Sequence, residues 1–156
     1  MSTDTTLNDP ILRAEAVKAA RGLRPFDFLI RNAMILDMVT GRERPVDVGV
    51  VGALIASVHA PSWARQAHAE LDAAGAYVVP GFIDTHMHVE SSMVIPAEYA
   101  RAVVPRGVTT VLWDPHEFAN VSGMSGIDYA CDAAKGLPLR VLTLAPTCVP
   151  SAPRFE

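Results

Sequence analysis

The sequence is poor in cysteine and in long apolar runs. Its two cysteines, Cys131 and Cys148, form neither a disulfide framework nor a C-x-x-C pair, so we expect both to be small buried residues. The most apolar stretch, residues 46–60, is too short and too interrupted by glycine to span a bilayer. Residues 1–8 lack the apolar core of a secretory signal. These absences predict a cytoplasmic protein.

An excess of positive charge is also missing, and so is the length of a complete barrel. The formal net charge of −4 gives no electrostatic reason to expect a nucleic-acid backbone or an anionic membrane as a partner. The 156 residues suffice for one packed core. A complete (β/α)₈ barrel typically needs about 250 residues. The length therefore excludes a whole barrel.

The first half of the chain has the pattern of one helix followed by short strands. Asp9 as the N-cap and Pro10 in the first turn predict a helix that ends before Gly22. From Phe26 onward apolar residues alternate, which is typical of half-buried antiparallel strands. The expected strands are 26–30, 34–36, 46–51 and 54–59, with turns at Asn32-Ala33, Thr40-Gly41 and Gly52-Ala53. We expect residues 61–74 to form a surface loop with some helix.

The second half alternates between strand and helix patterns. Apolar strands are expected at 108–113 and 139–144, and helices at 96–104 and 125–135. Ser125 and Asp128 resemble a capping box of the last helix. With a first strand after Tyr77, the order is β-α-β-α-β. This order predicts an α/β fold with a parallel sheet and right-handed crossovers.

Acidic residues and histidines alternate at the end of the first parallel strand. These residues are Asp84, His86, His88 and Glu90. They share one face if the strand continues that far. Two imidazoles about 7 Å apart along a strand can converge on one divalent cation, and Asp84 could orient a histidine ring from outside the metal. The alternative is two surface histidines near a strand end.

A second polar cluster, Asp114-Pro115-His116-Glu117, follows the next strand. Because the carboxyl ends of parallel strands meet at one edge, we expect His116 and Glu117 to face the same site. Asp114 is predicted to support a ligand from outside the metal. The alternative is an Asx-Pro turn with a solvated His-Glu pair.

Other polar residues lie in the same loops and after the third strand. Ser91, Ser92 and Asn120 could orient a substrate, or they could merely satisfy turns. Cys148 follows the third strand and has no evident activating base in the sequence, so it is expected to line the pocket and not to act as a nucleophile.

These motifs resemble one enzyme superfamily. The run Pro80-Gly81-Phe82-Ile83-Asp84-Thr85-His86-Met87-His88 resembles the first barrel strand of the amidohydrolases, and Val89-Glu90-Ser91-Ser92-Met93 is similar to their adenine deaminase branch. Further similarity lies in residues 107–111, 114–117, 119–121 and 145–150. The H-x-H pair alone marks only the superfamily, whereas H-x-H-x-E-S-S-M followed by D-P-H-E is much more specific.

The resemblance implies a chain of three parts. Residues 1–24 would be an N-terminal tail and helix, and residues 25–79 part of a small β-sandwich domain. Residues 80–156 would be the first three β/α units of a metal-dependent (β/α)₈ barrel. The resemblance also implies that the full-length family member is a homo-oligomer.

The reaction that the resemblance implies is the hydrolysis of adenine to hypoxanthine and ammonia, in purine salvage. It implies a binuclear divalent centre of Mn²⁺, Fe²⁺ or Zn²⁺ that activates water, with nearby carboxylates moving protons. His86 and His88 would hold one metal, and His116 would be a further metal ligand. Glu90 would accept hydrogen bonds from the purine and act in catalysis, and Glu117 would contact either a metal or the base.

The sequence departs from this family in two ways. Asn32-Ala33 stands where the family has an Asn-Gly hairpin turn, a change that costs about 1 kcal/mol of turn strain. Only about three of the eight barrel strands are present. The carboxylate of the fourth strand, the histidines of the fifth and sixth, and the aspartate of the eighth are therefore missing. We accordingly expect an incomplete barrel that is inactive as an isolated chain.

Three other functions compete with this interpretation. The chain could belong to an amidohydrolase that acts on cyclic amides or amidines, which needs no Glu90-Ser91-Ser92 run. It could also be a non-catalytic, truncated remnant. The third is a zinc base deaminase with an H-x-E motif, which His88-Val89-Glu90 matches; the absence of a following P-C-x-x-C in these residues disfavours it.

Overall fold

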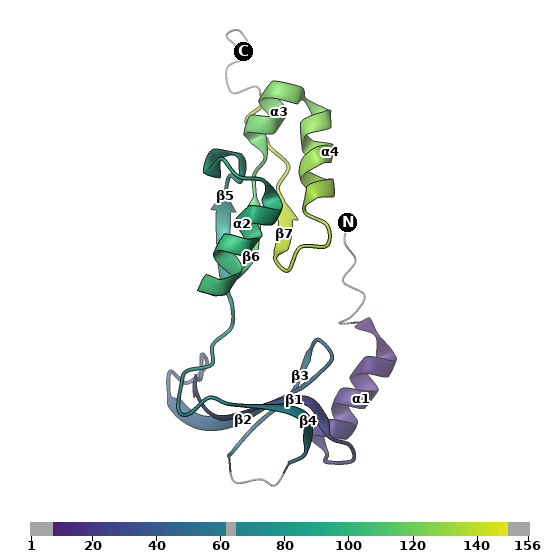
Figure 1. The fold of residues 1–156 in the computed structure, drawn as a ribbon, viewed down its shortest axis with the longest axis vertical. Helices are drawn as coiled ribbons and strands as arrows, with labels where there is room; N and C mark the ends of the chain where they lie inside the picture. The colour runs from purple at the N-terminus through teal and green to yellow at the C-terminus, as the bar shows by residue number, and fades with distance from the viewer. Residues whose placement is uncertain (1–7, 62–64, 150–156) are drawn as a thin grey trace. The chain divides into compact units, whose positions relative to one another are not determined.

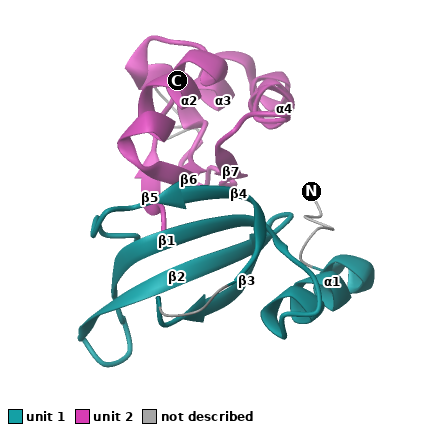
Figure 2. Ribbon diagram, turned by 60° about the horizontal axis from the view of Figure 1, so that its bottom comes forward, with its two compact units in different colours: residues 1–79 teal, residues 80–156 magenta. Residues whose placement is uncertain are grey.

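The computed structural model describes residues 8–61 and 65–149. The chain divides into two compact units, residues 1–79 and residues 80–156, with the boundary between Val79 and Pro80 (Figure 2). Each unit has its own sheet and its own buried apolar clusters. Among the described residues, no helix has both the length and the apolar character needed to cross a membrane.

A four-stranded sheet forms the first unit (Figure 1). Its strands are β1 (Phe26–Leu36), β2 (Glu43–Val51), β3 (Leu54–His59) and β4 (Ala67–Asp72), in the order β3-β2-β1-β4. The pairs β1–β2 and β2–β3 are antiparallel. The predicted turns at Thr40-Gly41 and Gly52-Ala53 are confirmed. The partial β-sandwich expected for this region stays a prediction.

β1 runs through Asn32-Ala33, so the turn predicted there is wrong. The pairing of β1 with β2 shifts register between Ile30 and Ala33, and Asn32 has a φ of 53°. Asparagine tolerates this left-handed conformation better than most residues. The Asn32 N–H donates to Asp47 Oδ1 over 2.9 Å. Asn32 therefore forms a β-bulge, and no turn strain arises from a missing glycine.

β4 lies where a loop with some helix was predicted, and that prediction is wrong for Ala67–Asp72, while residues 62–64 of the predicted loop lie outside the described residues. β4 pairs in parallel with β1, from Phe26 opposite Ala67 to Arg31 opposite Asp72. The Arg31 guanidinium binds the Glu70 carboxylate with distances of 2.6 and 2.7 Å. Almost all of β4 is exposed, so its sequence lacks the apolar alternation that reveals a half-buried strand.

The predicted N-terminal helix is confirmed as α1 (Pro10–Ala20). The Asp9 side chain accepts hydrogen bonds from the N–H groups of the first turn, as an N-cap does. Ala16 and Ala19 pack against Phe26 and Leu29 of β1. The helix therefore covers part of the sheet.

A three-stranded parallel sheet forms the second unit and confirms the predicted α/β pattern (Figure 1). The strands are β5 (Phe82–Met87), β6 (Val108–Trp113) and β7 (Arg140–Thr143), in the order β5-β6-β7. The connections contain α2 (Pro96–Val103), α3 (His116–Ser122) and α4 (Met124–Ala133), with short 3₁₀ turns at Glu90–Ser92 and Val104–Arg106. The short helix α3 was not predicted.

The central strand β6 contributes the largest fully buried side chain of this unit, Trp113. Val111 and Trp113 are fully buried, and Trp113 packs with Val89 and Ala130. A Cβ atom on Gly81 would collide with the Thr109 side chain of β6. The glycine before β5 is therefore required for the close approach of these two strands.

The predictions for Ser125 and for the two cysteines are wrong. α4 begins at Met124, so Ser125 lies inside its first turn and donates to the Ser122 carbonyl over 2.7 Å. It therefore forms no capping box with Asp128. Cys131 lies on the exposed side of α4, and Cys148 is also exposed, so neither cysteine is buried.

Replacing Asp47 by alanine should destabilise the first unit. The Asp47 side chain is 1% exposed, and its Oδ2 lies 3.5 Å from Arg31 Nη1. Its loss leaves the Asn32 N–H without an acceptor and Arg31 without its buried partner. We expect the free energy of unfolding to fall by about 3 kcal/mol in urea titrations followed by circular dichroism.

Glu70→Ala is the matched control, because it removes an exposed partner of the same arginine. We expect that variant to lose less than about 1 kcal/mol. Equal losses in the two variants would contradict a special role for the buried carboxylate.

Candidate metal centre

The candidate metal centre lies at the carboxyl ends of β5 and β6. β5 ends at Met87, between His86 and His88, and β6 ends at Trp113, directly before Asp114. The parallel register pairs Met87 with Trp113, so both strands end at the same level. Ligand sites of parallel α/β sheets gather at this edge.

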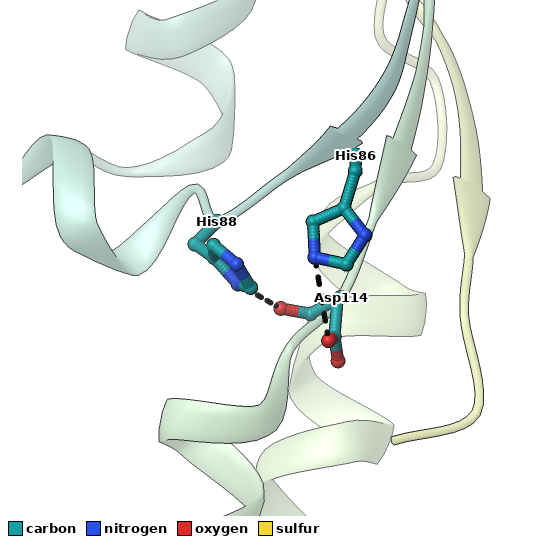
Figure 3. A group of neighbouring side chains, drawn as sticks. All are labelled: His86, His88 and Asp114. Carbon is teal, nitrogen blue, oxygen red and sulfur yellow. Dashed lines mark hydrogen bonds and ion pairs between the residues drawn. The ribbon is translucent and has the colours of Figure 1, made fainter. Parts of the chain in front are cut away.

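Both histidines face Asp114 (Figure 3). His86 Nε2 lies 3.7 Å from Asp114 Oδ2. One potential ligand atom from each of His86, His88 and Asp114 can be chosen so that all lie within 4.8 Å of one another. The three side chains thus form a group that could hold one cation.

A main-chain contact sets the tautomer of His88. Its Nδ1 lies 2.9 Å from the main-chain carbonyl oxygen of Asp114. Because a carbonyl only accepts hydrogen bonds, Nδ1 of His88 carries the proton. The Nε2 lone pair of the neutral ring is then free to bind a cation.

His116, the first residue of α3, lies close to the Asp114 carboxylate. Its Nδ1 lies 3.3 Å from Asp114 Oδ2, and its ring centroid lies 4.5 Å from that of His88. Asp114, His116 and Cys148 form a second group whose ligand atoms lie within 4.8 Å of one another. One buried carboxylate is therefore surrounded by three imidazoles.

The donor set fits a divalent cation. Asp114 is 8% exposed, and its Oδ1 is buried without a hydrogen-bond partner among the described residues. A buried carboxylate oxygen without a partner costs stability, and a cation would compensate it. Imidazole and carboxylate together suit Mn²⁺, Fe²⁺ and Zn²⁺. His86, His88 and Asp114 are the residues that would hold such an ion.

Glu90 occupies a separate position beside Trp113. β5 does not run as far as Glu90, which instead opens a 3₁₀ turn, so the predicted alternation stops before it. Glu90 Oε2 accepts a hydrogen bond from Trp113 Nε1 over 2.5 Å. Glu90 Oε1 is buried and has no hydrogen-bond partner in the described part of the chain. One oxygen is therefore fixed, and the other remains able to accept.

Glu117 lies at the start of α3 and links two loops. Its Oε1 accepts a hydrogen bond from Ser91 Oγ over 2.6 Å. It belongs to neither of the two groups of potential metal ligands found within the described residues. Ser92 Oγ donates to the Val89 carbonyl, and Asn120 is exposed on α3. The hydroxyl groups of both serines therefore already donate hydrogen bonds to residues of these loops.

Asp84 supports the main chain of His86. Its Oδ1 accepts a hydrogen bond from the His86 N–H over 3.2 Å. Burial, followed by the negative charge of Asp84, raises the pKa of the Tyr99 hydroxyl, so this hydroxyl stays protonated at neutral pH. Asp84 thus contacts the main chain of His86. The sequence predicted instead that Asp84 would contact a histidine ring.

Comparison with known proteins identifies the family of this chain. The model of the amidohydrolase family matches residues 77–156, which is just over half of the chain. The chain belongs to the amidohydrolase family. The matched segment contains the two groups of potential metal ligands described above.

Curated relatives of this amidohydrolase chain match it over nearly its whole length. Adenine deaminase 2 of Rhizobium meliloti is 65% identical over 150 residues, which are 96% of this chain and 25% of that protein. The adenine deaminase of Serratia proteamaculans is 58% identical over 144 residues, which are 92% of this chain and 24% of that protein. The chain therefore spans about a quarter of the length of these relatives.

A solved structure supports the fold. A D-aminoacylase, from a study of its binuclear metal centre, superposes with a TM-score of 0.61 at 26% identity. The superposition covers 78% of this chain and 30% of that chain.

Sequence reasoning missed three features of this amidohydrolase site. It placed Asp114 outside the metal, whereas the structure places its carboxylate among the potential ligands. It did not connect the Trp113 indole with Glu90, and no signal in the sequence links them. It placed Cys148 at the pocket but not beside His116.

Replacing His86 by alanine should weaken metal binding. The change removes one imidazole from the group around Asp114. We expect the Mn²⁺ affinity in isothermal titration to fall at least about tenfold, since even residues outside the metal's own ligands have effects of that size. His68→Ala, which removes an exposed histidine of β4, should leave the affinity unchanged. Unchanged affinity in His86→Ala would exclude this residue as a ligand.

Proposed function

We propose that this chain supplies part of an adenine deaminase site, which hydrolyses adenine to hypoxanthine and ammonia. The proposal includes a role in purine salvage in the cytoplasm. Two relatives that share 65% and 58% of the matched residues carry the name adenine deaminase. The residues around Asp114 and Glu90 belong to this matched part of the chain.

The observation that supports adenine most directly is the free oxygen of Glu90. This oxygen is buried and unpaired, beside a carboxylate oxygen that the Trp113 indole fixes. A buried acceptor favours a ligand that donates a hydrogen bond and disfavours one that cannot. Adenine is neutral and carries N–H donors, whereas an anionic substrate would be repelled by the carboxylate.

The reaction forms a C–O bond at C6 of adenine and breaks the bond to the exocyclic nitrogen. His86, His88 and Asp114 would hold a divalent cation, which when bound supplies a Lewis acid and lowers the pKa of water. The departing nitrogen takes up a proton and leaves as ammonia. We propose that Glu90 carries that proton, because its free oxygen can accept one and later donate it.

Glu117 is the second carboxylate of the proposal. Its hydrogen bond from Ser91 holds it at the start of α3.

We propose Mn²⁺ as the working ion of a binuclear centre, with Fe²⁺ and Zn²⁺ as the ions to compare.

A chimera tests the substrate. This chain would replace the matched quarter of the Rhizobium meliloti relative, and purified protein would be assayed with Mn²⁺ for release of ammonia and formation of hypoxanthine. We expect adenine to react, and cyclic amides such as hydantoin to remain intact.

The intact relative and the chain alone are the controls for this assay. The chain alone tests the expectation that three strands do not suffice. A chimera that binds Mn²⁺ and hydrolyses cyclic amides but not adenine would replace the proposal with another amidohydrolase activity. A folded chimera that binds Mn²⁺ and hydrolyses neither would favour the non-catalytic interpretation.

Glu90→Gln in the same chimera tests the proton carrier. Glutamine can still accept the Trp113 hydrogen bond, but it cannot carry a proton. We expect kcat to fall by about 10² to 10⁴, the range for general acid–base groups, with Mn²⁺ affinity unchanged. Glu98→Gln alters an exposed carboxylate of α2 that pairs with Arg101, and it should keep full activity. A normal kcat in Glu90→Gln would remove Glu90 from the mechanism.

A further inference from the structure

Two groups of potential ligands share one residue in the second unit. The first consists of His86, His88 and Asp114, and the second consists of Asp114, His116 and Cys148. The carboxylate of Asp114 thus belongs to both. Cys148 contributes a sulfur that neither the proposed reaction nor the predicted ligand set uses.

We propose that Asp114, His116 and Cys148 form a second cation subsite with a thiolate ligand. It would take a thiophilic divalent ion, with Zn²⁺ or Fe²⁺ favoured over Mg²⁺. The Asp114 carboxylate would join it to the His86–His88 subsite. The inference concerns metal binding alone and holds whether or not adenine is the substrate.

The spacing of the three side chains suits one ion. Their ligand atoms lie within 4.8 Å of one another. Around a tetrahedral zinc ion with the usual bond lengths, neighbouring ligand atoms lie about 3.4 to 3.7 Å apart. Side-chain rotations that move atoms by about 1 Å therefore close the group without moving the strands.

The three ligands come from elements that the parallel sheet holds together. Asp114 follows β6, His116 begins α3, and Cys148 lies in the segment after β7. Because β6 and β7 pair in parallel, their carboxyl ends lie at the same edge. The β6–β7 pairing therefore positions this subsite, as the β5–β6 pairing positions the first one.

The Asp114 carboxylate has the capacity to serve two ions. Oδ2 faces both His86 and His116, at 3.7 and 3.3 Å from their nitrogens. Oδ1 is buried and has no hydrogen-bond partner among the described residues. An ionised carboxylate offers about four lone-pair sites on two oxygens, which is enough for two cations.

The thiol is open to an incoming ion. Cys148 is a free and exposed cysteine. On binding, the sulfur forms a bond to the metal as thiolate, and its proton passes to solvent. Soft sulfur ligands select Zn²⁺ and Fe²⁺ from ions such as Mg²⁺, which prefer oxygen.

Cobalt titration of the 156-residue chain tests this subsite. Co²⁺ replaces Zn²⁺ and reports a thiolate ligand through a near-ultraviolet sulfur-to-cobalt charge-transfer band. We expect the band in the wild type and in Cys131→Ser, which removes the other exposed cysteine. We expect Cys148→Ser to lose it and to bind the corresponding equivalent of Co²⁺ at least about tenfold more weakly.

Alkylation of the wild-type chain gives a second readout that needs no variant. Iodoacetamide labelling followed by mass spectrometry should show that Zn²⁺ protects Cys148 but not Cys131. A charge-transfer band that survives in Cys148→Ser would overturn the proposal. So would equal labelling of Cys148 with and without saturating Zn²⁺. Adenine turnover enters neither measurement, so the proposed activity and this subsite can fail separately.

Discussion

The parallel pairing of β5 with β6 is the constraint on which the metal centre depends. With Met87 opposite Trp113, the two strands end level, and His88 meets the main chain of Asp114 there. A slip of one residue would turn every side chain of a strand to the other face. Trp113 resists such a slip, because its ring is fully buried and its indole N–H is bound to Glu90. The close approach at Gly81 further restricts the pairing of the two strands.

Two buried carboxylates show how similar groups serve different ends. Asp47 faces the guanidinium of Arg31, which is always charged, and accepts the bulge N–H of Asn32. Its charge is therefore compensated inside the protein. Asp114 faces imidazoles, which carry charge only when protonated, and one of its oxygens has no hydrogen-bond partner among the described residues. The first arrangement stabilises a sheet, and the second favours an added cation.

The sequence predicted those parts of the fold that apolar patterning and end signals define. β6 matches its expected residues, and Asp9 caps α1 as expected, because a buried run and an N-cap are local features. β4 was missed because its exposed residues show no alternation, and only its pairing with β1 makes it a strand. The H-x-H pair was found at its strand end, but the place of Glu90 depended on where β5 stops. The contact between Glu90 and Trp113 joins residues 23 apart in the chain and cannot be deduced from spacing.

The hydrogen bond from His88 to the carbonyl of Asp114 separates two properties that usually change together. The tautomer of this histidine is set by a main-chain atom, which every amino acid at residue 114 would supply. The charge beside it is set by the side chain of the same residue. An engineer can therefore exchange the carboxylate at this position, to alter which ions are preferred, while the main-chain carbonyl still holds the Nδ1 side of the imidazole.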